Sequence, residues 1–74
     1  MKCRVSFVWD DEADVWMATS EDVPGLVLES GSFDELVERV KVAIPELLES
    51  NIQTASYYDL LLTSERREMV GMHG

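Results

Sequence analysis

The sequence has a single cysteine and a single histidine, and this scarcity excludes several kinds of site. Cys3 has no second cysteine with which to form an internal disulfide, and His73 alone cannot build a metal centre, which needs several ligands. Because no histidine lies in the part of the chain expected to fold, Cys3 also lacks a base that would activate it as a nucleophile. We therefore expect Cys3 to be a small buried apolar residue and His73 to be an exposed tail residue. We expect no catalytic residue, no cofactor and no metal site.

Basic residues are scarce as well. Six Lys and Arg residues stand against fifteen Asp and Glu residues, and the formal net charge is −9. This balance argues against binding to nucleic acid, which requires cations that neutralise phosphates, and against attraction to an anionic membrane. The sequence also lacks an apolar run near the ~20 residues of a membrane-spanning helix, and its start lacks the pattern of a signal peptide. We expect a cytoplasmic protein whose charged partners are basic.

The chain is short for a protein that folds alone. Its 74 residues accommodate one hydrophobic core, so we expect a single domain over residues 1–74, ordered over about 3–68 and loose over 69–74. The composition is that of a globular protein, with 46% hydrophobic and 28% charged residues. A domain of this size buries only about 60% of the surface of its unfolded chain, and it therefore gains stability by covering a further surface in an assembly.

Three strands are predicted in the first half of the chain. Residues 3–9 alternate with period two and are rich in strand-forming side chains, with the odd-numbered residues on one face. The polar residues 10–14 form a hairpin turn, and the strand pattern resumes over residues 15–20. Pro24 and Gly25 then end the second strand and turn the chain into a short third strand over residues 26–29. Large residues occur on both faces near the hairpin, so the pattern does not decide which face is buried.

The clearest helical pattern begins at Ser32. Ser32 and Glu35 match a capping box, in which each side chain bonds to the free backbone amide of the other residue. Apolar residues follow at spacings of three and four: Phe33, Leu36, Val37, Val40, Ile44, Leu47 and Leu48. The opposite, solvated side carries Glu35, Glu38, Arg39, Lys41 and Val42. Pro45 interrupts the stripe, so we expect a kink there or a second helix with Pro45 in its first turn.

Residues 56–64 are aromatic and aliphatic and predict a fourth strand, with a short helix through residues 60–62 as the alternative. The fold class is α+β with the order β-β-β-α-β, an antiparallel four-stranded sheet with one helix packed on one face. One face of such a sheet stays uncovered, and we expect it to present Val8, Trp16 or a ring of Tyr57 or Tyr58. Open edge strands also bind other strands unless they are protected.

The residues that remain as candidates for function are interface residues. Asp10, Glu12 and Asp14 have spacing that faintly resembles a calcium loop, but the turn glycine and the distal bidentate glutamate are missing. The aromatic residues lack the interleaved Lys and Arg of a nucleic-acid platform, so packing or an interface is favoured. We predict that an interface uses Trp9, Trp16, Tyr57, Tyr58 and Leu60, and that Asp10, Asp11 and Asp14 steer a basic partner.

Three stretches together resemble a known superfamily: the run FVWDDEADVWMATS over residues 7–20, the stretch SEDVPGL over residues 20–26, and GSFDEL over residues 31–36. In this order they are similar to the N-terminal domain of HicB-like antitoxins. SEDVPGL, together with the sequence IPELL over residues 44–48, more closely resembles a short branch of that superfamily without assigned function. Pro45 belongs to the second motif. The resemblance covers residues 3–68 and rests on structural motifs, so it indicates the fold better than the activity.

The resemblance implies a β-β-β-α-β fold that is a partial RNase H-like fold without nuclease chemistry. It also implies homo-oligomers built through sheet or edge contacts. HicB antitoxins neutralise a small basic toxin that cleaves mRNA, and most carry a C-terminal DNA-binding segment for which this sequence has no room. Two functions therefore stay open: an acidic, antitoxin-like module that binds a basic protein, and a stand-alone dimer or tetramer with a structural or small-ligand role.

Overall fold

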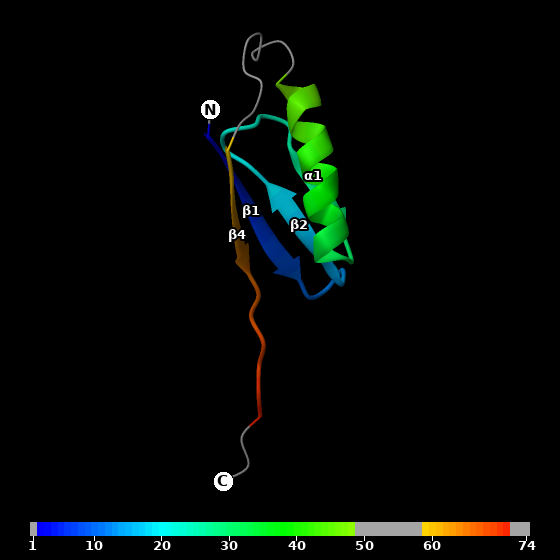
Figure 1. The fold of residues 1–74 in the computed structure, drawn as a ribbon. Helices are drawn as coiled ribbons and strands as arrows, with labels where there is room; N and C mark the ends of the chain where they lie inside the picture. Colours follow the sequence, from blue (N-terminus) through cyan, green and yellow to red (C-terminus); the bar gives the residue numbers. More distant parts are fainter. Residues whose placement is uncertain (1, 49–58, 72–74) are drawn as a thin grey trace.

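The computed structural model describes residues 2–48 and 59–71 of the chain. A three-strand meander leads into one helix, and a fourth strand follows (Figure 1). The elements, in chain order, are β1 (Lys2–Asp10), β2 (Val15–Thr19), β3 (Val27–Ser30), α1 (Phe33–Leu47) and β4 (Asp59–Glu65). The predicted α+β class and the element order are confirmed. Of the two alternatives for the last element, the structure shows the strand.

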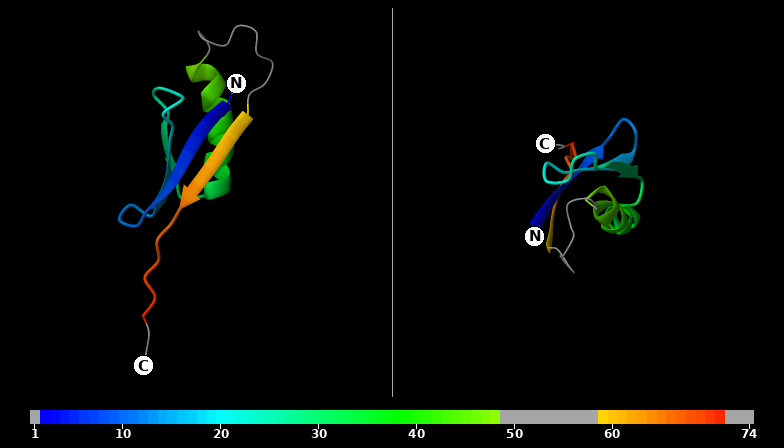
Figure 2. Two further views of the ribbon diagram at one scale, coloured as in Figure 1. Left: turned by 90° about the vertical axis from the view of Figure 1, so that its left-hand side faces the viewer. Right: turned by 90° about the horizontal axis from the view of Figure 1, so that it is seen from above.

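The sheet has the strand order β3-β2-β1-β4, and it is mixed where an antiparallel sheet is expected. The pairs β1–β2 and β2–β3 are antiparallel, whereas β4 lies parallel to β1. The reason is the direction of the chain. β3 runs in the same direction as β1, α1 returns the chain to the starting end, and β4 must then run in the direction of β1 (Figures 1 and 2). Parallel pairing follows because β4 occupies the free edge beside β1.

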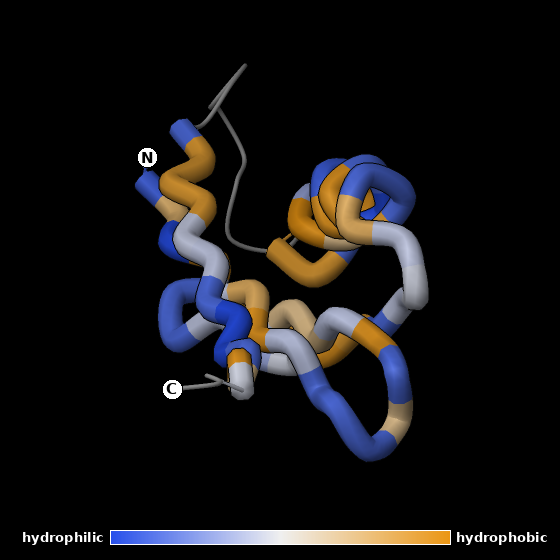
Figure 3. The backbone as a smooth tube through the Cα atoms, turned by 90° about the horizontal axis from the view of Figure 1, so that it is seen from below, coloured by the Kyte–Doolittle hydropathy of each residue, from blue (hydrophilic) through white to orange (hydrophobic). Residues whose placement is uncertain are grey.

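The hydrophobic core lies between the sheet and α1, which packs on β2 and β3 (Figures 2 and 3). The odd-numbered residues of β1 supply one wall: Cys3, Val5 and Phe7 are all fully buried. The helix supplies the facing wall through Leu36, Val40, Ile44 and Leu48, as its apolar stripe predicts. Burial of side chains of this size contributes about 1.5–3 kcal/mol each, so these positions supply most of the stability.

The outer face of the sheet carries the side chains that alternate with the core residues. Val8 lies there and is 46% exposed, as expected, and Val27 is 63% exposed. The prediction for Trp16 is different from what the structure shows. Trp16 pairs with Trp9 in the antiparallel register, and its ring packs on Phe33 with the centroids 5.1 Å apart. It is therefore half-buried on the helix side, because the helix begins beside it with an aromatic residue.

The hairpin turn between β1 and β2 is stabilised by hydrogen bonds to Asp10. The Asp10 side chain accepts hydrogen bonds from the amides of Glu12 (3.0 Å) and Ala13 (3.3 Å). The Asp14 amide donates to the Asp10 carbonyl at 2.8 Å, and Asp14 has a left-handed φ of 59°. Aspartate tolerates that conformation better than most residues, which explains its place at the end of the turn.

The segment that follows β2 is fastened to β1 by two polar side chains. The Arg4 amide donates to the Asp22 carboxylate at 2.8 Å, and the Ser20 hydroxyl donates to the Arg4 carbonyl. The Asp22 amide in turn donates to the Ser20 hydroxyl oxygen at 3.1 Å. β2 has ended at this level, so these side chains satisfy backbone groups of β1 that would otherwise have no strand partner.

A tight turn completes the same motif. Leu26 donates its amide to the Val23 carbonyl at 3.2 Å, and Gly25 has a φ of 87°. This is a type II turn, in which Pro24 fixes the first central φ and the second central position requires a positive φ. Val23 and Leu26, on either side of the turn, are both buried in the core. The sequence SEDVPGL therefore has a structural role. Its polar side chains bond to the backbone of β1, and Val23 and Leu26 fill the core at this end of the sheet.

The helix begins as predicted, but only half of the capping box forms. Ser32 accepts a hydrogen bond from the Glu35 amide at 3.2 Å, whereas the Ser32 amide donates to the Ser30 hydroxyl at 3.1 Å. Ser30 therefore replaces the Glu35 side chain as the reciprocal partner. A second helix at Pro45 is not formed, because α1 runs as one element through Pro45 to Leu47. Pro45 lies in the last turn, where the loss of one hydrogen bond affects few following residues.

Candidate functional site

A groove runs along α1 on the side that faces β3, with a cavity volume of about 410 Å³. Its apolar lining comes from Leu28 of β3 and from Val42 and Ala43 of α1. Val42 is 64% exposed although it lies on a helix that packs against the sheet. The groove exists because Leu28 and Ala43 pack against the edge of the core while the side chain of Val42 remains at the surface. An aliphatic or aromatic side chain of another molecule could be buried there.

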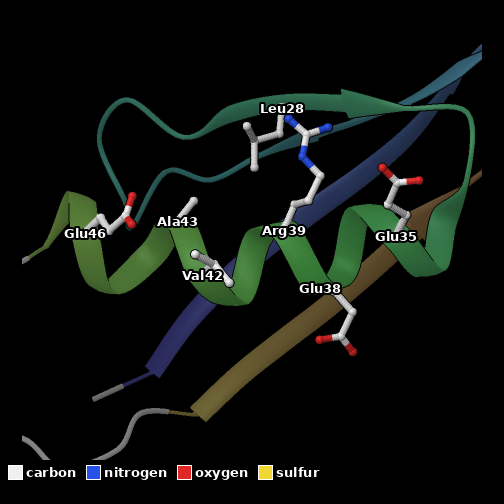
Figure 4. Close-up of a pocket in the computed structure, with 7 residues that line it drawn as sticks. All are labelled: Leu28, Glu35, Glu38, Arg39, Val42, Ala43 and Glu46. Carbon is white, nitrogen blue, oxygen red and sulfur yellow. The ribbon is translucent and has the colours of Figure 1, made fainter.

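Carboxylates flank this apolar surface. Figure 4 shows Glu35 and Glu46 on the side of α1 that faces β3, towards the two ends of the groove. Glu38 also lines the groove but points away from β3, and its carboxylate pairs with the Lys41 ammonium at 3.3 Å. The arrangement of an apolar centre between two carboxylates suits a hydrophobic side chain with cationic neighbours.

Arg39 lies between the two carboxylates and is directed to the sheet. Its guanidinium donates a hydrogen bond from Nη1 to the Glu29 carbonyl at 2.9 Å. Figure 4 shows the side chain reaching from α1 to β3. This bond ties the helix to the edge strand and covers part of that edge, so Arg39 acts as a structural clamp within the groove.

Trp9 and Trp16, the two aromatic interface candidates that the structure describes, lie together at the hairpin end of the core. The Trp9 and Trp16 rings meet edge to face with centroids 5.4 Å apart, and Phe33 joins them beside Trp16. The Trp9 indole N–H donates to the Asp11 carboxylate at 2.7 Å, and the Arg66 guanidinium lies 4.1 Å from its ring centroid. Both tryptophans are half-buried. Their use in an interface stays a prediction.

The other predicted residues that the structure describes lie in the adjoining hairpin turn and in β4. The Asp10 carboxylate bonds to amides of the hairpin turn and the Asp11 carboxylate accepts the Trp9 indole N–H, so two of the three carboxylates have local roles, whereas Asp14 contributes to the turn through its backbone. Leu60 is half-buried in β4 and packs on the core. Tyr57 and Tyr58 lie outside the described residues. Among the described residues, the structure brings the two tryptophans and the three aspartates together at the hairpin end of the sheet, whereas Leu60 lies beside Cys3 at the other end of β1.

A second, more polar cavity of about 470 Å³ lies at the end of the sheet where Ser20 and Asp22 fasten β1. Hydroxyls from three neighbouring strands line it, because Thr19 and Thr63 both pair with Ser6 in the sheet register. The lining also includes Arg4, Val5, Ser20, Glu21 and Asp22. The mixture of one cation, two carboxylates and hydroxyls points to no single class of ligand.

The buried cysteine has the environment expected for a core residue. Cys3 is fully buried, and its burial raises the pKa of the thiol, with a further contribution from the negative charge of Asp22. Both effects keep the thiol protonated and unreactive. Within residues 2–48 and 59–71, no group of three or more His, Cys, Asp or Glu side chains could hold a metal ion. The same residues contain no helix that is long and apolar enough to span a membrane.

Residues 2–72 match a family model described as a domain of unknown function (DUF1902). The chain belongs to this family. A crystal structure of the hypothetical protein TTHA1013 from the extreme thermophile Thermus thermophilus is similar, with 38% sequence identity and a TM-score of 0.78. That comparison covers 95% of this chain and 100% of the Thermus chain. No curated protein matches the sequence significantly. The match confirms a family of unassigned function, and the link to HicB-like antitoxins stays a prediction.

The groove is a feature that the sequence pattern did not reveal. Val42 is expected on the solvated side of the helix, and its exposure confirms this. What the pattern does not show is that Leu28 and Ala43 extend the apolar surface beside it, because the position of α1 over β3 depends on packing between distant segments. The available signal is a valine on the polar side of the helix, between Glu38 and Glu46.

Proposed function

We propose that this protein is a small acidic binding module that docks a basic protein in the groove between α1 and β3. The observation that carries the proposal is the groove itself: an exposed apolar centre, with Glu35 and Glu46 near its ends, on a chain of net charge −9. Charged surfaces of opposite sign accelerate encounter and set orientation, whereas the apolar centre supplies the affinity.

The chemistry of the groove defines the part of the partner that it would hold. An aliphatic or aromatic side chain would cover Val42 and Leu28, and a Lys or Arg on either side of it would approach Glu35 and Glu46. Arg39 keeps its positive charge in the groove, so the cations of such a segment would approach Glu35 and Glu46 towards the ends of the groove and the apolar anchor would lie beside Val42. The partner segment is therefore amphipathic, with its cations flanking an apolar anchor.

In its finer form, the proposal is that the partner is a small basic toxin that cleaves mRNA and that this protein neutralises it. The support is the resemblance of residues 7–36 to HicB-like antitoxins, together with the acidic charge. The neutralising contact would be made by the groove, without any catalytic step in this chain.

The test is affinity capture from the native host, followed by mass spectrometry. The wild type is expected to retain a small basic protein, encoded beside its own gene if the pair is a toxin and antitoxin. The variant Glu35→Lys/Glu46→Lys is expected to lose it. The control Glu12→Lys/Glu21→Lys changes the net charge equally but lies on exposed residues outside the groove, so it should retain the partner.

Two results would contradict the binding proposal, and a third would contradict only its antitoxin form. If no basic protein is captured, the binding function is wrong. If the groove variant and its control retain the captured protein equally, the groove is not the docking site. If the captured protein does not cleave mRNA, the antitoxin form fails while the binding module stands.

A second function, a stand-alone homo-oligomer, is favoured by the free edge of β4. β4 pairs with β1 on one side, and no described strand covers its other side. Leu61 and Leu62 are 47% and 38% exposed on this edge strand. Sedimentation velocity of the wild type should then show a dimer or tetramer. A monomer at micromolar concentration would exclude this function.

A further inference from the structure

The segment after β4, residues 66–71, forms an extended arm that projects beyond the sheet (Figure 1). Its first residue is held: the Arg66 guanidinium lies over the Trp9 ring and donates to the Glu68 carboxylate at 2.7 Å. Further along, Met69 is 98% exposed and Val70 is 82% exposed. The arm therefore starts from a fixed point on the domain and carries apolar side chains into solvent.

The arm gives the chain an elongated shape. The molecule measures 60 × 19 × 18 Å, and its radius of gyration of 15.0 Å compares with about 11 Å for a compact domain of this length. Ordering an extended segment costs conformational entropy, and the exposed side chains of Met69 and Val70 recover little of it through contacts within the chain. Such an arm becomes favourable when its backbone and side chains contact another molecule.

We propose that two copies of this chain exchange their arms, each β4 and its arm pairing antiparallel with β4 of the other copy. This inference rests on self-association, the second function proposed above. A two-fold axis at Thr63 brings Asp59 of each copy opposite Arg67 of the partner subunit. Residues 59–67 then form one continuous ladder, and the tips of the arms run past the start of the partner's β4.

Charge favours this register over its two neighbours, of which the one centred on Ser64 would place Asp59 opposite Met69 of the partner subunit and lose the attraction to Arg67. Opposite residues in an antiparallel pair share a face of the sheet. The register can therefore change only by two residues at a time, which moves the two-fold axis by one residue along β4. An axis at Leu62 would place Asp59 opposite Glu65 of the partner subunit, and symmetry would repeat this repulsion. The axis at Thr63 replaces both repulsions with an attraction to Arg67. It also places the exposed Leu62 opposite Ser64 of the partner subunit, which carries no charge.

The two edges of the sheet differ in their suitability for this pairing. β3 is short, from Val27 to Ser30, and the Arg39 guanidinium from α1 already occupies the Glu29 carbonyl. β4 is seven residues long, and its exposed leucines favour burial. Edge strands without protection pair with other strands, and the protected edge is β3.

A charge-swap series measured by sedimentation velocity tests the proposal on the full chain. The wild type is expected to be a dimer, and Arg67→Asp should weaken dimerisation about tenfold or more because it places two carboxylates opposite each other. The double variant Asp59→Arg/Arg67→Asp should restore wild-type affinity. The control Lys41→Asp makes the same charge change at an exposed position of α1, which packs on β2 and β3 and not on β4, and should leave the dimer intact.

Each outcome is informative. Restoration by the double variant supports the register directly, since a general loss of folding would not be rescued. A dimer that Arg67→Asp does not weaken overturns the arm exchange but keeps self-association. A monomeric wild type overturns both.

An engineered cysteine on the axis gives an independent readout. In Thr63→Cys the two cysteines face each other, so mild oxidation should link the subunits covalently, and the buried Cys3 should not compete. Leu61→Cys is the matched control, because its opposite residue is Glu65 of the partner subunit. Cross-linking through position 61 in place of 63 would contradict the proposed axis.

Discussion

Replacing Asp22 by alanine should destabilise the domain although the residue is exposed. Its carboxylate accepts the Arg4 amide at 2.8 Å, at a level of β1 where β2 has ended. A hydrogen bond to a charged acceptor contributes about 1.5–3 kcal/mol, and exposure to water places this one near the lower limit. We expect Asp22→Ala to lower the free energy of unfolding by about 1.5 kcal/mol.

The corresponding shift in melting temperature is about 6–12 °C for a domain of this length. Asp22→Asn keeps an acceptor oxygen without the charge and should cost less, about 0.5 kcal/mol. Urea and thermal denaturation followed by tryptophan fluorescence will measure both, because Trp9 and Trp16 lie at the edge of the core.

Glu21→Ala is the matched control, since it removes a neighbouring exposed carboxylate with the same charge. If Asp22→Ala and Glu21→Ala lower stability equally, the bond to Arg4 is not what fastens this segment. In that case the structural role assigned to the SEDVPGL motif is wrong.

Two further outcomes concern the helix and the buried thiol. Ser32→Ala removes the acceptor of the Glu35 amide and should lower the free energy of unfolding by about 1 kcal/mol in urea denaturation; an unchanged midpoint would show that the cap contributes nothing. The raised pKa of Cys3 means that the folded state holds the thiol proton more tightly than the unfolded state does. The stability that this contributes is complete below the ordinary thiol pKa of 9.0 and is lost as the pH rises above it. Cys3→Ala should therefore flatten the decline of stability at alkaline pH, and parallel profiles for the two proteins would refute the argument.

Local chemistry accounts for the parts of the fold that the sequence predicts correctly. Alternation predicted that Cys3, Val5 and Phe7 share one face of the first strand, which the structure shows to be the buried face, and the Pro24-Gly25 pair predicted the turn that Gly25 completes with a positive φ. Each of these depends on residues that are close in the chain. Such features can be predicted from the sequence without knowledge of the tertiary structure.

Features that depend on distant segments were not predictable in the same way. The parallel pairing of β4 with β1 depends on which edge the last strand reaches after the helix, and alternation does not encode that choice. The side chain of Ser30 replaces Glu35 at the helix start because β3 ends close to the cap. Trp16 lies on the helix side because Phe33 offers it an aromatic neighbour.

The candidate site likewise combines a property that the sequence predicts with a feature that depends on tertiary structure. Composition alone indicated an acidic protein, and the structure shows an apolar groove beside Glu35 and Glu46, which we propose as the docking site of a basic partner. The acidic hairpin turn was predicted to steer a basic partner because its charges lie close together in the sequence. Its Asp10 carboxylate is engaged in backbone hydrogen bonds within the turn.

The central claim, that the groove between α1 and β3 binds a basic amphipathic segment, is tested most directly by NMR. Backbone amide shifts of the ¹⁵N-labelled protein would be followed during titration with a synthetic peptide that alternates arginine and leucine. A peptide with glutamate in place of arginine serves as the control. We predict that the basic peptide shifts resonances of α1 between Glu35 and Glu46 and of β3 around Leu28, and that the acidic peptide shifts none. Shifts centred on residues 10–14, or equal shifts with both peptides, would contradict the claim.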